Sequence, residues 1–301
     1  METSPVALST SHRSWYDRWY KILLVVPLVI LAVCLVYLVM FYRIHGDVIY
    51  KDVSLSGGTT ITLRGESVES SGLEQRLKAS IPDAGVRTIT ELRTGRQLAV
   101  IVESSVAPEE LQSAIEKTLG TQLAREEMTV EFTGPVLSST FYRQLISALV
   151  FSFILISIVV FILFRTVIPS LTVIFAIFAD IVMPLAVIDL SGIRLSAAGI
   201  AAFLMLIGYS VDTDILLTTR VLKKREGSVN ERIYGAFKTG IFMNTTGLLA
   251  VIPAFFVVTG LPDSFRQIFL ILGIGLFADV INTWLTNASM IKWYTEVKRI
   301  T

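Results

Sequence analysis

Charged residues are scarce in this sequence, and so are cysteine and histidine. Of its 301 residues, 17% are charged and 53% are hydrophobic, whereas a soluble domain carries about 25% charged and about 45–50% apolar residues. With 26 basic against 25 acidic side chains, the chain lacks the positive surplus typical of nucleic-acid binding. A single cysteine, Cys34, excludes a disulfide scaffold. The composition indicates an integral membrane protein with one sizeable polar domain.

Six apolar stretches are each long enough to cross a bilayer, which takes roughly 20 residues in a helix. They lie at 22–42, 144–164, 166–188, 195–219, 239–262 and 267–291. The first run is longer than the apolar core of a signal peptide and lacks small residues at its exit, so we interpret it as a retained anchor. The sequence therefore predicts a polytopic α-helical membrane protein with six transmembrane helices.

The distribution of Lys and Arg predicts the orientation, because cytoplasmic loops carry an excess of both. Basic residues gather before the first run, in the 220–238 loop and in the tail, whereas the opposite short loops hold only Arg194 and Arg266. Both termini are expected in the cytoplasm of a multi-pass protein of the cell membrane. The resulting division is a cytoplasmic N-terminus at 1–21, helix one at 22–42, an external domain at 43–143, helices two to six at 144–291 and a cytoplasmic tail at 292–301.

The segment between the first two helices has the pattern of a small α+β domain. Alternating apolar residues predict strands at 53–63, 86–92, 97–102 and 128–132, and amphipathic spacing predicts helices at 67–80 and 108–119. The order βαββαβ is that of a ferredoxin-like sandwich, a fold that by itself implies no activity. The segment has no cluster of metal ligands and no nucleophile motif. We expect a binding or gating module with no metal, no cofactor and no catalytic residue.

Four carboxylates fall within the apolar runs, namely Asp180, Asp212, Asp214 and Asp279. Each costs about 2.5–3.5 kcal/mol near the centre of a membrane helix, so each is expected to face a polar interior. Asp212 is the favoured functional residue because of its depth and its polar neighbours. Asp214 has the alternative of pairing with Arg220 or Lys223 at the helix end, and Asp180 that of a structural hydrogen-bond acceptor.

Polar residues recur on three of the same runs and predict a hydrated seam between the fourth, fifth and sixth helices. On the last run, the spacing of Asp279, Asn282, Thr283 and Thr286 places all four on one helical face. Simple packing is the alternative, because Ser and Thr in membrane helices often bond to their own backbone or to a neighbouring helix. The predicted seam comprises Ser210, Thr213, Asn244, Thr245, Thr246, Asn282 and Thr283.

One motif in the fourth run carries a family resemblance. Gly208-Tyr209-Ser210-Val211-Asp212-Thr213-Asp214 resembles the fourth-span signature of the SecD/SecF family of protein-export membrane proteins, which belongs to the resistance-nodulation-division (RND) superfamily. The pair Gly57-Gly58, the pair Gly134-Pro135 before the second run, and Arg220 after the fourth match the same family. The order of one span, an external domain and five further spans is similar to that of the family over almost the whole chain.

The resemblance implies an auxiliary subunit of the Sec machinery. Such a subunit pairs with a SecD-like membrane protein, acts beside the Sec translocation channel and assists exported polypeptides across the membrane with energy from proton flow. The bacterial signature has Asn and then Asp where this chain has Asp212 and Thr213, so the coupling acid is displaced by one residue and either Asp212 or Asp214 replaces it. These variants are closer to archaeal members. Our proton-coupling candidates are Asp212, Asp214, Asp279, Asp180 and Lys238, which stands where the family has an arginine entering the fifth span.

Two other classes of protein compete with this interpretation. An RND-type exporter of small molecules or lipids shares the membrane fold, but usually carries two six-helix halves and larger external domains in one chain. An intramembrane aspartyl protease also uses two carboxylates on neighbouring helices. Its Tyr-Asp and Gly-x-Gly-Asp motifs are absent here, because Asp180 follows Ala179 and Asp212 follows Val211.

Overall fold

Six helices long and apolar enough to span a membrane form the larger part of the molecule. The structure is a computed structural model that describes residues 15–64, 72–90, 94, 96–123, 128–224, 226–257 and 263–299. The first five long helices are Trp15–His45 (α1), Pro135–Phe164 (α5), Val167–Leu190 (α6), Ala197–Lys223 (α7) and Val229–Val257 (α8). The sixth long helix consists of three consecutive segments, whose bounds follow in the next paragraph. The predicted six-helix membrane architecture is confirmed.

The last long helix changes its geometry in the middle. It begins as α9 (Asp263–Ile281), continues as a π-helical segment η2 (Asn282–Asn287) and ends as α10 (Ala288–Lys298). π-helical turns are rare and occur frequently at functional sites. Every polar residue of η2 is buried in the bundle, so the widened turn presents its side chains to neighbouring helices.

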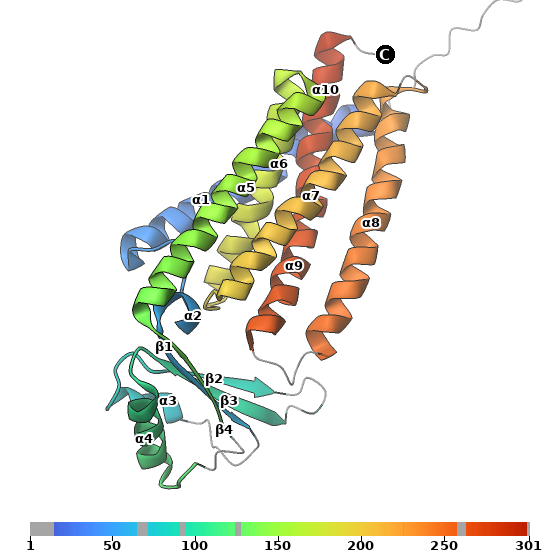
Figure 1. Ribbon diagram of the computed structural model, residues 1–301. Helices are drawn as coiled ribbons and strands as arrows, with labels where there is room; N and C mark the ends of the chain where they lie inside the picture. The colour runs from blue at the N-terminus through green and yellow to red at the C-terminus, as the bar shows by residue number, and fades with distance from the viewer. Residues whose placement is uncertain are drawn as a thin grey trace, which may run out of the picture.

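The long helices run side by side, and a small domain lies at one end of the bundle (Figure 1). The start of α1 and the end of α10 meet at the opposite end, where Lys292 forms an ion pair with Asp17 at 2.6 Å and Tyr20 donates a hydrogen bond to Glu296 at 2.6 Å. We call these two ends the domain end and the far end. Helices α6, α7 and α9 form the centre of the bundle, whereas α5 and α8 expose most of their surface.

The small domain, the β-domain, is an antiparallel sheet with two helices on one face (Figure 1). Its elements are β1 (Gly58–Arg64), α3 (Leu73–Lys78), β2 (Gly85–Thr90), β3 (Gln97–Ser104), α4 (Pro108–Leu119) and β4 (Met128–Thr133). The strand order β2-β3-β1-β4 confirms the predicted ferredoxin-like fold. Alternate residues of β1 and β3, among them Ile61 and Val100, are buried against Leu77 of α3 and Leu111 of α4.

The prediction that the first strand starts at residue 53 is wrong. Residues Val53–Ser56 form a short helical turn, α2, before the strand begins at Gly58. Asp52 caps this turn, because its carboxylate accepts a hydrogen bond from the backbone N–H of Ser54 at 2.8 Å. Residues 65–71 and 91–93 lie outside the described residues, and with them the start of the helix predicted at 67–80.

The two glycine motifs of the sequence meet where the β-domain joins the bundle. Gly57 has a φ of +86°, and a Cβ atom placed on it would lie 2.6 Å from Cα of Pro135, the first residue of α5. Gly58 has a φ of +131°, and its Cβ would lie 2.3 Å from the carbonyl oxygen of Ser104 on β3. Only glycine tolerates both the conformation and the contact. The pairs Gly57-Gly58 and Gly134-Pro135 therefore form one joint.

We expect Gly58→Ala to destabilise this joint by about 1–3 kcal/mol, the cost of a strained backbone, or more because of the clash with Ser104. Gly46→Ala is a matched control, because Gly46 also has a positive φ of +75° but no atom within 4 Å of its Cβ position. Thermal unfolding of the purified variants measures the difference. Equal losses of stability in both variants would contradict a role for the close contact.

Candidate functional site

Three carboxylates from three different helices are buried in the middle of the bundle. Asp180 on α6, Asp214 on α7 and Asp279 on α9 are 1%, 0% and 0% exposed. A buried carboxylate requires hydrogen-bond donors to replace water. Neighbouring helices supply these donors, and we call the whole group the carboxylate cluster. Its other members are Ser210, Thr213, Asn244, Asn282, Thr283 and Asn287.

Asp180 is held by one donor from each of two helices. Ser210 of α7 donates a short hydrogen bond to one carboxylate oxygen, Oδ2. The amide of Asn282, the first residue of η2, donates to the other, Oδ1, at 2.6 Å. These bonds join α6 to both α7 and the last long helix.

Asp279 and Asp214 lie on opposite sides of one threonine. Asn244 of α8 donates to Asp279 Oδ2 at 2.8 Å, and the hydroxyl oxygen of Thr213 lies 3.1 and 3.2 Å from the two Asp279 oxygens. Asn287 donates to Asp214 Oδ1 at 2.7 Å. The hydroxyl oxygen of Thr283 lies 3.0 Å from Asp214 Oδ1 and 3.2 Å from Asp279 Oδ1. The last long helix thus contacts carboxylates on two other helices.

In the described part of the chain, neutral side chains donate all the hydrogen bonds that these carboxylates accept. Among the described residues, no lysine, arginine or histidine forms a hydrogen bond or an ion pair with Asp180, Asp214 or Asp279. Burial of a negative charge without a cation is costly. A proton bound to the cluster removes one such charge, so the site is suited to bind and release protons.

The structure brings together part of the predicted seam. Ser210, Thr213, Asn244, Asn282 and Thr283 all join the cluster. Thr245, Thr246 and Lys238 are exposed on α8 instead. Thr246 donates to the backbone of its own helix, and Lys238 lies over the ring of Tyr234.

The expectation that Asp212 faces a polar interior of the chain is wrong. Asp212 is exposed on α7, whereas its neighbours Thr213 and Asp214 are buried. Successive residues of an α-helix point about 100° apart, so α7 cannot direct all three side chains into one interior. Once Thr213 and Asp214 face the cluster, Asp212 points outward.

The sequence interpretation of the far end also needs correction. Arg220 does not pair with Asp214. It donates to the backbone carbonyl of Gly235 and to the hydroxyl of Thr239 at 3.0 Å, and it thereby joins α7 to α8. The partner of Asp214 that the sequence interpretation missed is Asn287. Asn287 lies four residues after Thr283 and therefore on the same face of the helix, and both side chains donate to Asp214 Oδ1.

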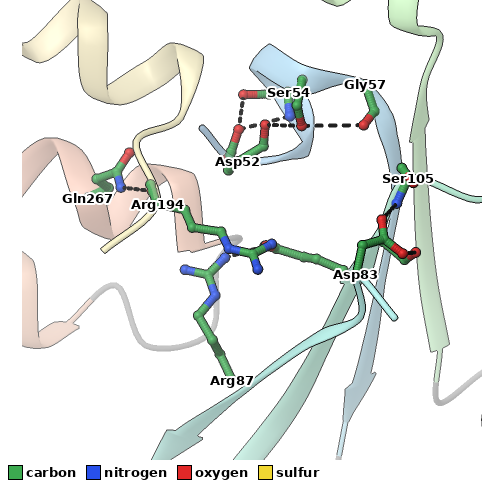
Figure 2. A network of polar contacts seen from close by, with 11 residues as sticks. Asp52, Ser54, Gly57, Asp83, Arg87, Ser105, Arg194 and Gln267 are labelled. Carbon is green, nitrogen blue, oxygen red and sulfur yellow. Dashed lines mark hydrogen bonds and ion pairs between the residues drawn. The ribbon is translucent and has the colours of Figure 1, made fainter. Parts of the chain in front are cut away.

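A second polar network connects the β-domain to the domain end of the bundle. Figure 2 shows Arg87 of β2 and Arg194 of the α6–α7 loop pointing toward each other. Between them lies Glu103 of β3, which is buried and forms ion pairs with both, the one with Arg194 at 3.2 Å. Gly85, opposite Glu103 in the sheet, leaves room for the Arg194 guanidinium, because a Cβ there would lie 2.7 Å from its Nη2.

The network continues into the ends of α7 and α9. Gln267 of α9 donates to the backbone carbonyl of Arg194 at 2.7 Å and accepts from the N–H and hydroxyl of Ser196 at 2.8 and 2.5 Å. Ser196 is the N-cap of α7. The N–H of Ala197, the first residue of α7, donates to the hydroxyl of Ser54 in α2 at 2.9 Å. We call this network the junction (Figure 2).

Asp52 is the titratable group of the junction with a shifted pKa. Burial raises the pKa of Asp52 to about 6, the negative charge of Glu103 adds to the rise, and the hydrogen bonds from Ser54 oppose it. Its Oδ1 accepts from the Ser54 hydroxyl at 2.5 Å, and its own N–H donates to the carbonyl of Leu195 at 3.0 Å. Asp52 therefore belongs to both the β-domain and the bundle.

Comparison with known proteins identifies the family. The family described as "Protein export membrane protein SecD/SecF, C-terminal" matches residues 113–297. A protein-export membrane protein SecF from Pyrococcus furiosus is 35% identical over 91% of this chain and 90% of its own length. The chain belongs to the SecD/SecF protein-export family. A further SecF from Methanothermobacter thermautotrophicus is 38% identical over 71% of this chain and 86% of its own length.

Solved structures in the SecD/SecF family share the fold. The crystal structure of SecDF, a translocon-associated membrane protein from Thermus thermophilus, matches 94% of this chain with a TM-score of 0.74 and 19% sequence identity. A SecDF structure in a super-membrane-facing form matches with a TM-score of 0.55. This chain spans 39% of the Thermus SecDF chain.

We expect Asp52→Asn to change how stability depends on pH. Because the pKa of Asp52 is about 6 in the folded protein and about 3.9 in the unfolded chain, the folded state binds the proton more tightly. This contribution is fully present below about pH 4 and is lost as the pH rises through about 6. The variant keeps an acceptor for Ser54 but does not titrate. Unfolding temperatures of the wild type should therefore fall more steeply with pH across this window, and parallel curves would contradict the assignment.

Proposed function

We propose that this chain is the SecF-type subunit of a SecD–SecF complex that assists Sec-dependent export of polypeptides and is coupled to proton flow. The observation that supports it best is the carboxylate cluster, because three buried acids with no cationic partner in the described ranges suit reversible protonation. In this proposal the acids bind and release protons, and no bond of a substrate is broken. The subunit is not an enzyme.

The proposed orientation places the β-domain outside the cell and both termini in the cytoplasm. It is supported by the surplus of Lys and Arg in the segments at the far end. A proton that crosses a membrane potential of 100 mV contributes about 2.3 kcal/mol. With the β-domain on the outer side, this energy is available where an exported chain emerges.

The connection between cluster and β-domain supports a mechanical role. Each of α6, α7 and α9 carries one carboxylate of the cluster, and the domain ends of the same helices carry the junction residues Arg194, Ser196 and Gln267. A proton that binds the cluster changes the attraction between these helices. We infer that the resulting shift reaches the β-domain through Glu103, which pairs with Arg194.

The exposed face of α7 supports a partner within the membrane. Met205, Gly208 and Asp212 lie on one exposed stripe of this helix. A carboxylate that faces lipid costs about 2.5–3.5 kcal/mol, and a glycine allows another helix to approach closely. We infer that a SecD-like membrane protein packs here and offers a hydrogen-bond donor or a cation to Asp212. The Sec channel and the exported chain are the proposed contacts of the β-domain.

We expect Asp279→Asn to lower export to the level of a strain that lacks the chain. Asparagine resembles the protonated acid in shape and keeps acceptor and donor atoms in the cluster, so the protein should fold but not exchange protons at this site. Secretion of an exported protein in cells is the measurement, with and without a protonophore. Thr246→Val, on the exposed face of α8, is the control. Normal, protonophore-sensitive export in Asp279→Asn would contradict proton coupling through the cluster.

We expect Asp212→Leu to weaken assembly without harming the isolated chain. Leucine on this face removes the unfavourable exposure of a charge to lipid, so the unfolding temperature of the chain alone should stay constant or rise. Co-purification with the SecD-like protein should decrease. Met205→Leu is the matched control, because it replaces one apolar side chain on the same stripe by another of similar volume. Undiminished co-purification of Asp212→Leu would exclude this face as the interface.

A further inference from the structure

Thr283 occupies an unusual position between two acids. Its hydroxyl oxygen lies 3.0 Å from Asp214 Oδ1 and 3.2 Å from Asp279 Oδ1, and its side chain is fully buried. A hydroxyl has one proton to donate and two lone pairs that accept. It therefore donates to only one of the two carboxylates at a time. The other contact becomes a hydrogen bond only when that carboxyl carries a proton of its own.

A second hydroxyl beside Asp279, that of Thr213, also indicates that one carboxyl of the cluster carries a proton. The hydroxyl of Thr213 has a backbone acceptor, the carbonyl of Ser210 at 2.9 Å, which is closer than either oxygen of Asp279 at 3.1 and 3.2 Å. If Thr213 and Thr283 donate to their nearest acceptors, Asn244 is the donor that remains for Asp279. A proton on Asp279 then completes the network, with Thr213 or Thr283 as its acceptor.

Asp214 provides an outlet on the far side of Thr283. Its Oδ1 accepts from Thr283 and Asn287, whereas its Oδ2 is buried without a partner. Thr218 lies one helical turn nearer the far end, on the same face of α7, and its hydroxyl is also buried without a partner. Unpartnered buried polar atoms are uncommon in native proteins. Here they extend from Asp214 in the direction of the far end.

One residue of the π-helical segment contacts both Asp214 and Asp279. Asn282 and Thr283 are neighbours in η2 but reach different helices, Asn282 the Asp180 of α6 and Thr283 the Asp214 of α7. Thr286, in the same segment, is buried as well, but no hydrogen bond connects it to a carboxylate in the described part of the chain. The bridging position therefore belongs to Thr283 alone among the described threonines of this segment.

We propose that Thr283 is the proton relay between Asp279 and Asp214, an inference that rests on the proposed function. In the step, Asp279 Oδ1–H gives its proton to the Thr283 hydroxyl oxygen while the Thr283 hydroxyl proton passes to Asp214 Oδ1. Asp279 becomes an anion, Asp214 becomes neutral and Thr283 keeps one proton. After Asp214 has released its proton and Asp279 has taken up another, rotation of the Thr283 hydroxyl restores the starting arrangement.

The charges around the relay remain balanced during this step. The titratable groups that face it are Asp214 from α7, Asp279 from α9 and, across Ser210 and Asn282, Asp180 from α6. Helix α8 contributes the neutral Asn244. One negative charge moves from Asp214 to Asp279, and the total charge of the cluster does not change.

The test compares Thr283→Val, which has nearly the same shape but no hydroxyl, with Thr283→Ser, which keeps the hydroxyl. Thr286→Val is the control for loss of a buried threonine in the same segment. Each variant of the complex with its SecD-like partner is reconstituted in vesicles, and a pH gradient drives proton uptake that an enclosed dye reports. A positioned proton-transfer group contributes about a hundredfold or more. We expect about this loss of uptake in Thr283→Val, and wild-type-like uptake in Thr283→Ser and Thr286→Val.

A second measurement on the chain alone separates failure of the relay from failure of the proposed function. The infrared carbonyl band of a protonated Asp279, identified by its disappearance in Asp279→Asn, should shift in Thr283→Val and stay in place in Thr286→Val. If the wild-type complex takes up no protons, the proposed function fails, and the infrared band still decides whether Thr283 contacts the acid proton. Wild-type uptake in Thr283→Val, or an unshifted band, would overturn the relay.

Discussion

Three buried carboxylates, which have no cationic partner among the residues that the structure describes, constrain the rest of the structure. Each must receive hydrogen bonds from neutral side chains, because the apolar interior of a membrane bundle offers no water to replace them. Asp180, Asp214 and Asp279 obtain these donors from helices other than their own. The cluster thus determines how α6, α7, α8 and the last long helix face one another. Three residues of the π-helical segment, Asn282, Thr283 and Asn287, donate to acids on two other helices.

The β-domain is joined to the same helices by two kinds of contact. Steric contacts at Gly57 and Gly58 hold the start of β1 against α5 and β3. Ionic contacts of Glu103 hold the sheet against the α6–α7 loop. Because the loop and the N-terminus of α7 are in turn bound by Gln267, a movement of α7 or α9 along its axis must move or break these bonds. The close contacts at Gly57 and Gly58 and the ion pairs of Glu103 therefore both connect the β-domain to the bundle.

Much of the fold follows from patterns that are local in the sequence. Runs of about 20 apolar residues predict membrane helices, and alternation with period two predicts the strands of the β-domain. Residues 53–56 were an exception, because Asp52 caps a helical turn within what looks like a strand. The junction was missed entirely, since Glu103 and Gln267 lie far apart in the chain and look like ordinary polar residues. No local pattern indicates that both meet Arg194.

The amino-acid sequence places acids and neutral donors at similar depths of the membrane segment, and it predicts that they meet, because insertion in a bilayer is costly for any charge that has no polar surroundings. Which acids lie inside depends on how the helices pack. A helix turns by about 100° per residue, so the packing of α7 buries Thr213 and Asp214 and turns Asp212 outward. The packing of the last long helix against α7 likewise brings Thr283 and Asn287 to Asp214. These choices depend on helix rotation, which is set by contacts between segments distant in the chain.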